Sequence, residues 1–268
     1  MPAAIATIPR AVRGEINAQL DAIERDHNVR ILFAVESGSR AWGFPSPDSD
    51  YDVRFVYVHS LDWYLSIDKR RDVIELPINA ELDINGWDLK KALRLLIKPN
   101  PVLLEWLRSP VIYRADKPAM TTLARLSLRT AHKRPSTYHY LRLAETQYRR
   151  FIADKETVAL KKYFYSLRPA LALMWLRSNA KGPLPMAISD LRDGVDLPAE
   201  TSDIIEDLLQ QKAKSRELGR GPRAAALDTL IEHEIALAQD ATVDETAMDP
   251  DIVEAANRVF RKLVLKDG

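Results

Sequence analysis

A change of pattern near residue 115 constrains the fold of this 268-residue chain more than any other feature. Before that point, short apolar segments typical of strands are mixed with helical segments. After it, the periodic segments repeat their apolar residues at helical spacing. Strands that come early and helices that follow argue against a doubly wound parallel sheet, in which the two alternate. The sequence therefore predicts an α+β fold of two domains, residues 1–115 and an all-helical domain of residues 116–268.

The first domain is predicted to contain four strands. They are short, rich in β-branched and aromatic residues, and lie at residues 29–37, 50–58, 72–78 and 81–88. The last two are expected to pair as a hairpin through Asn79 and Ala80. An amphipathic helix is predicted over residues 10–27, and Asp88 and Asn100 are suited to cap two further helices.

The composition excludes several classes of protein. The chain has 39 Lys and Arg against 38 Asp and Glu, so its net charge of +1 does not suit a polycation that coats nucleic acid. It contains no cysteine, which excludes disulfides, thiolate metal sites and cysteine nucleophiles, and which fits a reducing compartment. We find neither an apolar run of about 18 residues nor a signal-peptide pattern, so we expect a cytoplasmic protein without a membrane span.

The segment ESGSRAWGFPSPDSDYDVRF, residues 36–55, brings acidic residues unusually close together. Asp50 and Asp52 are two residues apart on a predicted strand, so both point to the same face. Like charges at that separation destabilise each other unless a cation lies between them. Mg²⁺ prefers carboxylate and phosphate oxygens. The pair therefore indicates a divalent metal site.

A third carboxylate is available on a later strand. Asp83 is flanked by the apolar residues Leu82 and Ile84, as expected for a strand residue. If its strand lies beside the strand of Asp50 and Asp52, its carboxylate completes a cluster of three acids. Asp88 is the alternative, but it already has a suitable role as a helix N-cap. Three such acids suit two-metal catalysis of phosphoryl transfer.

The residues before the acids favour a phosphate-binding turn. Gly38 follows a buried strand, where a glycine lets the backbone approach a ligand closely. The Ser39 hydroxyl adds a hydrogen-bond donor, and Arg40 can add a charge-assisted one. The competing interpretations are an ordinary turn for Gly38 and an exposed strand face for Asp50 and Asp52.

Other residues near the acids have simpler explanations. Arg54 lies on the same strand face as Asp50 and Asp52, where it could pair with a carboxylate or with phosphate. Trp42 and Phe44 are expected to serve in packing. Among the histidines, His59, His132 and His139 show no metal-binding spacing and are interpreted as structural or exposed.

The helical domain offers a second group of candidates in KKYFYSLRPALALMWL. Lys161, Tyr165 and Arg168 fall at helical spacing and form a polar stripe beside an apolar one. Together with Lys162 they are candidates to reach the triphosphate or the base. The alternative is a solvated helix face, which is the commoner reason for charges on a helix.

These motifs resemble a known family. Gly38-Ser39, then Asp50-x-Asp52 on a strand and Asp83 on a later strand, resemble the signature of the DNA polymerase β-like nucleotidyltransferase superfamily. The longer blocks, including ELDINGWDLKKAL and NPVLLEWLRSP, are similar to one branch of it, the RlaP family, named for an association with RNA repair. The likeness spans roughly residues 30–180.

The resemblance implies a small mixed sheet with helices followed by a helical domain that closes over the nucleotide. It also implies two Mg²⁺ ions, with Mn²⁺ as an alternative, and transfer of NMP from an NTP with release of pyrophosphate. The expected acceptor is an RNA end. The alternatives are the hydroxyl of a protein, as in a regulator or toxin, or a catalytically silent module that binds nucleotide or RNA. The resemblance leaves the choice of NTP and the oligomeric state open.

Overall fold

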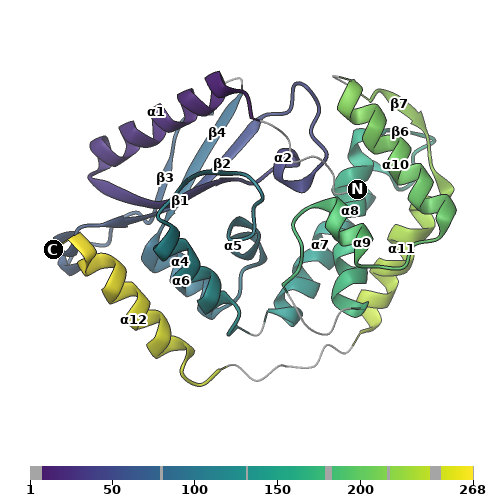
Figure 1. The fold of residues 1–268 in the computed structure, drawn as a ribbon. Helices are drawn as coiled ribbons and strands as arrows, with labels where there is room; N and C mark the ends of the chain where they lie inside the picture. The colour runs from purple at the N-terminus through teal and green to yellow at the C-terminus, as the bar shows by residue number, and fades with distance from the viewer. Residues whose placement is uncertain are drawn as a thin grey trace. The chain divides into compact units, whose positions relative to one another are not determined.

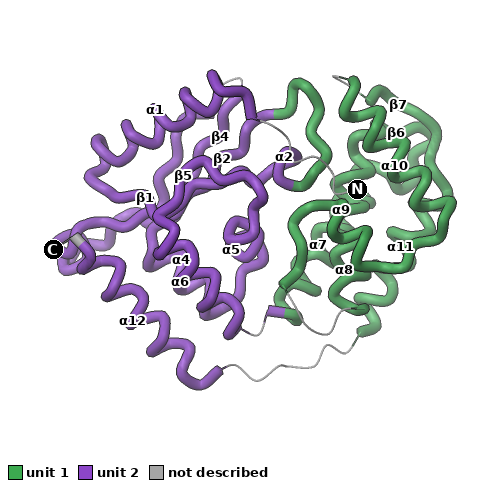
Figure 2. The backbone as a smooth tube through the Cα atoms, in the orientation of Figure 1, with its two compact units in different colours: residues 1–4, 42–49, 133–245 green, residues 5–41, 50–132, 246–268 purple. Residues whose placement is uncertain are grey.

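A computed structural model of the chain describes residues 8–78, 81–130, 132–178, 183–215, 218–241 and 249–267 (Figure 1). The chain divides into two compact units (Figure 2). The sheet unit contains the described residues up to 41, residues 50–132 and the described residues from 249 onwards. The helical unit contains residues 42–49 and the described part of 133–245.

The sheet unit is built on five strands in the order β3-β4-β2-β1-β5. Their bounds are β1 Val29–Glu36, β2 Tyr51–His59, β3 Val73–Glu75, β4 Leu82–Asp88 and β5 Ile112–Ala115. The central pair β2 and β4 is parallel, whereas β1 pairs antiparallel with both β2 and β5, and β3 antiparallel with β4. The sheet is therefore mixed, as predicted.

Helices cover both faces of this sheet (Figure 1). One face packs on α1 (Arg10–His27) through a cluster that includes Ile16, Leu20 and Phe55. The other face packs on four helices through a cluster that includes Leu32 and Val56. These helices are α4 Leu89–Ile97, α5 Pro101–Trp106, α6 Lys117–Ser127 and α12 Ile252–Val264. The short helix α3 (Leu61–Leu65), the 3-10 turn η1 (Leu265–Asp267) and the first three residues of the short helix α2 (Ser39–Trp42) complete the unit.

Local sequence signals explain where several of these elements begin. The carboxylate of Asp88 accepts the N–H of Lys90 at 2.7 Å, which caps α4. Asn100 accepts the N–H groups of Val102 and Leu103 and so caps α5. Both predicted caps are confirmed. The pairing of β3 with β4 confirms the predicted strand pair, and its connection at Asn79 and Ala80 lies outside the described residues.

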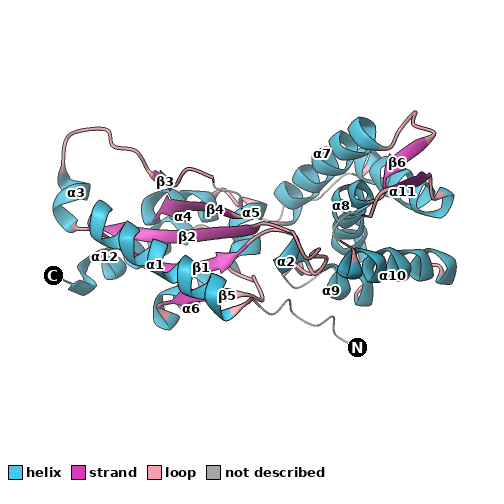
Figure 3. Cartoon of the chain, turned by 90° about the horizontal axis from the view of Figure 1, so that it is seen from above, coloured by secondary structure: helices cyan, strands magenta, loops and turns pink. Residues whose placement is uncertain are grey.

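The helical unit is built around α8 (Lys161–Ser178), which packs on α7 (Lys133–Phe151) and α11 (Ala225–Asp240). Helices α9 (Ile188–Asp193) and α10 (Ala199–Lys214) complete it (Figure 3). Its core is almost entirely aromatic and aliphatic, and Phe164, Leu167 and Leu171 are fully buried. None of the helices in the described part of the chain has the combination of length and apolar character that crossing a membrane requires.

The compact units differ from the predicted domain bounds. Residues 116–132 and α12 belong with the sheet, because α6 and α12 fill one of its faces. The expectation of a second domain without strands is wrong in one detail, since β6 (Thr157–Ala159) and β7 (Arg220–Pro222) form a small antiparallel sheet. These three-residue strands are too short to produce a recognisable alternation in the sequence.

Candidate active site

The site is centred on two carboxylates that face each other across neighbouring strands. Asp52 on β2 and Asp83 on β4 are partners in the parallel register of the two strands. Strand partners on one face lie close together, so the two side chains share one patch of the sheet. Both are about one-third exposed. The structure therefore meets the condition on which a cluster including Asp83 depends, that its strand lies beside Asp52.

Arg54 lies between these two carboxylates. Its Nη2 is 2.6 Å from Oδ2 of Asp83 and 3.3 Å from Oδ1 of Asp52. Its Nη1 also donates to the backbone oxygen of Asp83 at 2.7 Å. The guanidinium side chain is only 18% exposed, so its charge is poorly screened by solvent. The side chain of Arg54 thus supplies the positive charge that two adjacent acids require.

Asp50 differs from its expected place. It precedes β2, which begins at Tyr51, and its side chain is exposed. Its backbone oxygen accepts the Nε–H of Arg40 at 3.3 Å. The charge of Asp50 nevertheless reaches the site, because it raises the pKa of Asp52. The prediction that Asp50 lies on the strand is therefore wrong, while its role as a metal ligand stays a prediction.

The pKa of Asp52 is raised above its ordinary value by burial and by neighbouring negative charge. Burial is the largest cause and raises this pKa, and the charges of Asp83 and Asp50 raise it further. The guanidinium groups of Arg54 and Arg40 act in the opposite direction. A carboxylate with this much negative charge around it is stabilised by a cation nearby.

Gly38 makes room for the carboxylate of Asp52. A Cβ atom at position 38 would lie only 1.8 Å from Oδ2 of Asp52, far inside van der Waals contact. Glycine is therefore required here by the neighbouring acid, independently of any phosphate. From the sequence, Gly38 was placed at the site but was explained only as part of a phosphate-binding turn.

Ser39 and Arg40 follow in the short helix α2. Ser39 is half-buried at the first position of this helix. Arg40 is buried, and its guanidinium lies 4.0 Å from the ring centroid of Tyr51. Because Arg40 also lowers the pKa of Asp52, it contributes positive charge to the site from the side of β1.

Glu36 is the residue that sequence reasoning missed. It is the last residue of β1, it is fully buried, and its Oε1 accepts the backbone N–H of Asp52 at 2.9 Å. Its Oε2 accepts the hydroxyl of Tyr113 at 2.5 Å. Burial raises the pKa of Glu36 to about 7, and these two hydrogen bonds oppose that rise. The only signal in the sequence was a charged residue ending an apolar strand.

Asp88 is excluded from the carboxylate patch by its other contacts. It is buried, and besides capping α4 it accepts the hydroxyl of Tyr64 at 2.6 Å. The partner of Asp88 across the parallel strands is Tyr57, six positions along β2 from Tyr51. The choice of Asp83 over Asp88 as the acid beside Asp52 therefore agrees with the geometry.

The predicted nucleotide-binding residues of α8 all belong to the helical unit. Lys161 is exposed, and Nζ of Lys162 lies 4.2 Å from the ring centroid of Phe151 and 5.1 Å from that of Tyr165. Arg168 is only 3% exposed, which differs from the expected polar stripe. Its Nε donates to the backbone oxygen of Met186 at 3.0 Å.

Arg168 also packs against aromatic rings of the same unit. Its guanidinium carbon lies 4.9 Å from the ring centroid of Trp42 and 6.0 Å from that of Tyr140. The polar stripe is interrupted because α8 runs through the centre of the helical core, where most of its faces are covered. Contacts of these four α8 residues with a nucleotide stay predictions.

The chemistry of the carboxylate patch suits a hard divalent cation. Its donors are carboxylate oxygens, and the guanidinium of Arg54 stands in for a cation between Asp52 and Asp83. Within the described ranges, no three His, Cys, Asp or Glu side chains are gathered closely enough to hold a metal ion. The residues fit a divalent metal in kind and charge, with Asp52 and Asp83 as its nearest candidate ligands.

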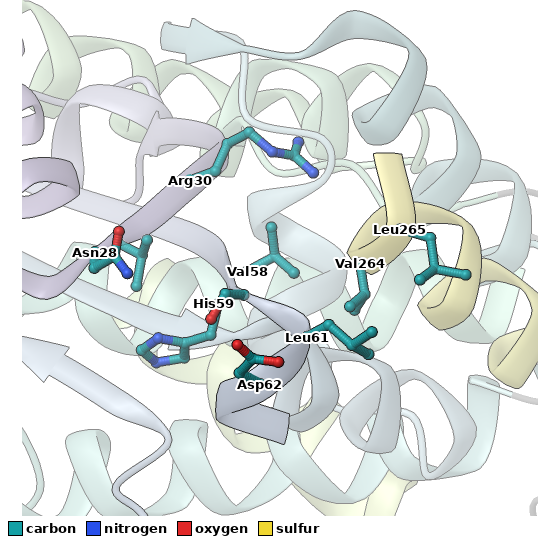
Figure 4. Close-up of a pocket in the computed structure, with 10 residues that line it drawn as sticks. Asn28, Arg30, Val58, His59, Leu61, Asp62, Val264 and Leu265 are labelled. Carbon is teal, nitrogen blue, oxygen red and sulfur yellow. The ribbon is translucent and has the colours of Figure 1, made fainter. Parts of the chain in front are cut away.

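A cavity of about 380 Å³ lies at the other end of β1 and β2 (Figure 4). It is lined by residues that include Asn28, Arg30 and His59, and His59 is seven residues beyond Asp52 on β2, roughly 23 Å of extended strand. Arg30 donates to the backbone oxygen of Leu263 at 2.7 Å. The cavity is therefore separate from the carboxylate patch.

Comparison with protein-family models identifies the family of this chain. A family model described as "RNA repair pathway DNA polymerase beta family" matches residues 12–262, nearly the whole chain. The protein is thus of the polymerase β-like class, and its family supports a nucleotidyltransferase. More specifically, the chain belongs to the RlaP family, which confirms the resemblance found in the sequence.

Two further similarities are of different strength. The chain is 43% identical over 256 residues to the Bacillus subtilis (strain 168) protein named "Uncharacterized protein YcgL", covering 93% of this chain and 96% of that protein. A nucleotidyltransferase-like protein from Exiguobacterium sibiricum 255-15 matches 94% of this chain and 77% of that one. The TM-score is 0.29 with 14% identity, so this structural likeness supports no inference.

Proposed function

We propose that this protein is a Mg²⁺-dependent nucleotidyltransferase that moves an NMP from an NTP to an acceptor hydroxyl, preferably at an RNA end. The observation that carries the proposal is the pairing of Asp52 with Asp83 across β2 and β4, with Gly38 leaving space for one carboxylate. Membership of the RlaP family supports the choice of reaction. The RNA acceptor rests on the family's description alone.

Each residue of the patch has a proposed role. Asp50, Asp52 and Asp83 hold two Mg²⁺ ions, for which Mn²⁺ can substitute. When bound, these ions stabilise the negative charge of the transferring phosphoryl group and favour ionisation of the acceptor hydroxyl. Gly38 and Ser39 hold the triphosphate, and Arg40 adds positive charge beside it.

The reaction is an in-line substitution at the α-phosphorus. The acceptor oxygen forms a bond to that phosphorus while the bond to the pyrophosphate oxygen breaks, and pyrophosphate leaves. The carboxylate of Asp83 takes up the proton of the acceptor hydroxyl. We further propose that Lys161, Lys162, Tyr165 and Arg168 of α8 contribute to binding the nucleotide. Arg168 would act through its packing, since it is buried within the helical unit.

Transfer to a protein hydroxyl is the second candidate. The net charge of +1 favours it, because binding a long RNA depends on many Lys and Arg contacts to phosphate. A catalytically silent module that binds nucleotide or RNA is a third. The charges of Asp83 and Asp50, which converge on Asp52, argue against it, since a silent site gains nothing from the repulsion among three acids. The absence of cysteine fits action in the reducing cytoplasm.

The test uses the purified full chain, Mg²⁺ and each α-³²P-labelled NTP in turn. Total cellular RNA and lysate protein are offered separately as acceptors. The diagnostic variant is Asp52→Asn with Asp83→Asn. The matched control is Asp48→Asn, which removes an exposed carboxylate from the same segment outside the patch.

The expected result is label entering RNA, lost in the double variant and kept in the control. Label entering a protein band would replace the RNA acceptor by a protein hydroxyl. No transfer to any acceptor, with NTP binding still detected, would favour the silent module. Full activity in the double variant would show that the site is wrong.

A further inference from the structure

The backbone of Asp52 is held at both of its polar groups by the end of β1. Its N–H donates to Oε1 of Glu36 at 2.9 Å, and its carbonyl oxygen accepts the N–H of Ser37 at 2.9 Å. The regular register of β1 with β2 ends one step earlier, where Glu36 is paired with Val53. A side chain therefore takes the place of the next backbone acceptor in the ladder.

Glu36 is itself held in place by hydrogen bonds to residues near β5. Its Oε2 accepts the Tyr113 hydroxyl at 2.5 Å, its carbonyl oxygen accepts the Ser109 hydroxyl at 2.6 Å, and its N–H donates to the oxygen of Val111 at 3.0 Å. The side chain is 0% exposed. Burying a carboxylate is costly unless hydrogen bonds compensate it, so an apolar residue would serve strand packing more simply.

The consequence of this arrangement is geometric. Fixing both the N–H and the C=O of one residue fixes the direction of its Cα–Cβ bond. In Asp52 that bond points the carboxylate into the space left by Gly38, where a Cβ would be 1.8 Å from Oδ2. Sites of this kind lose function when a ligand group is displaced by about 1 Å.

We propose that Glu36 is a positioning residue that sets the orientation of the Asp52 carboxylate through the Asp52 N–H. This inference rests on the proposed function for its importance to metal binding. The hydrogen bond from the Asp52 N–H to Glu36 is part of the fold, so one test of the inference needs no metal. The role requires an acceptor atom at position 36 and does not require a charge.

Substitutions of Glu36 separate a requirement for an acceptor atom from a requirement for a charge. Glu36→Gln keeps an oxygen toward the Asp52 N–H, and its amide can donate to the Tyr113 hydroxyl. Glu36→Met keeps the volume but removes the acceptor. Ser109→Ala is the matched control, because it removes a hydrogen bond to the backbone of Glu36 and leaves its carboxylate in place. If Glu36→Met does not fold, Tyr113→Phe loosens the carboxylate at its other oxygen.

The metal-independent test is amide hydrogen exchange of the ¹⁵N-labelled full chain without divalent ions. In Glu36→Met, and to a lesser degree in Tyr113→Phe, the Asp52 N–H should exchange faster relative to neighbouring β2 amides. The expected change in Glu36→Met is at least about tenfold, as for a buried N–H that loses its acceptor. Glu36→Gln and Ser109→Ala should keep wild-type relative exchange. Unchanged relative exchange of the Asp52 N–H in Glu36→Met, or in Tyr113→Phe if that variant replaces it, would overturn the inference.

The second test is a Mn²⁺ titration followed by electron paramagnetic resonance, at a temperature where every variant is folded. The wild type should bind Mn²⁺, and binding should be lost in Asp52→Asn with Asp83→Asn. Glu36→Met should weaken binding at least about tenfold, with recovery in Glu36→Gln. Equal affinity in wild type and Glu36→Met would overturn the inference. No Mn²⁺ binding by the wild type would count against the proposed function, and the exchange test would still decide the role of Glu36.

Discussion

Arg54 holds Asp83 at two points, donating from Nη1 to its backbone oxygen at 2.7 Å and from Nη2 to its Oδ2 at 2.6 Å. The same Nη2 reaches Asp52, so one guanidinium pairs with both acids of the patch and offsets one of their two negative charges. A cation that enters this patch must share the two carboxylates with Arg54 or displace it. The arginine therefore supports the two carboxylates, and it would compete with a bound metal for them.

Arg54→Met should accordingly lower stability without metal and increase the response to metal. Leaving two acids without their partner should cost on the order of 1–3 kcal/mol in the free energy of unfolding, measured in urea with a chelator. Added Mg²⁺ should raise the melting temperature of the variant more than that of the wild type. Arg25→Met, at a side chain that is 71% exposed, is the control and should change stability little. An equal Mg²⁺ response in Arg54→Met and wild type would contradict the competition.

Gly38→Ala should disrupt the patch because its methyl group would occupy the place of Oδ2 of Asp52. We expect a loss of about 1–3 kcal/mol in the free energy of unfolding, together with loss of nucleotidyl transfer. The matched control is Gly14→Ala within α1, where a Cβ would meet no atom within 4 Å. That substitution should stabilise the protein by roughly 0.5–1 kcal/mol, since alanine is favoured in a helix interior. A fully active Gly38→Ala protein would show that the patch can rearrange.

Gly86 on β4 supports the same pair of strands from within the core. It faces Phe55, and a Cβ there would lie 2.2 Å from the ring. Gly86→Ala should therefore destabilise by about 1–3 kcal/mol through overpacking. Phe55→Leu should relieve most of that penalty, so a double-mutant cycle in urea should show a favourable coupling energy. Additive effects would indicate that the ring moves aside.

Lys212 gives a prediction of pH dependence in the helical unit. Its Nζ donates to the backbone oxygen of Phe44 at 2.6 Å, and burial lowers its pKa to about 8, helped by the charge of Lys161. Between pH 8 and the ordinary lysine range near 10.5, the unfolded chain holds more protons at this group than the folded one. Its contribution to stability therefore rises with pH in that window.

The corresponding experiment compares unfolding free energies at pH 7 and pH 9.5. Relative to Lys212→Met, the wild type should gain on the order of 1–2 kcal/mol over this interval. Lys214→Met, an exposed lysine of the same helix, should follow the wild type. A constant difference between wild type and Lys212→Met would mean that Lys212 keeps its proton throughout.

The parts of the fold that were predictable have local causes. The first helix and the caps at Asp88 and Asn100 follow from residues only a few positions apart, and the structure has them as predicted. Strand β5 was missed because its four residues show no clear alternation, and it is held in place by pairing with β1 across more than 75 residues of sequence. Such pairing leaves no local pattern.

The residues of the candidate site also divide into those with a local sequence signal and those without one. Asp52 and Asp83 were predictable because each is an acid in an apolar, alternating segment. Glu36 was not, since the residue that explains its burial, Tyr113, is 77 positions away. Arg168 seemed to belong to a polar stripe because helical spacing was visible, whereas the packing of α7 and other helices around α8 was not.

The position of α12 has a consequence for the order in which the protein is assembled during translation. Ile252, Ala256 and Leu263 of this helix fill the same core as Leu32 and Val56 of the sheet. The helices of the helical unit, α7 to α11, are synthesised between these two groups of residues. While the ribosome is still adding residues, the sheet that begins first therefore lacks part of its core and exposes apolar surface. We expect the helical unit to finish folding earlier, although it starts later, and chaperones to act chiefly on the unfinished sheet.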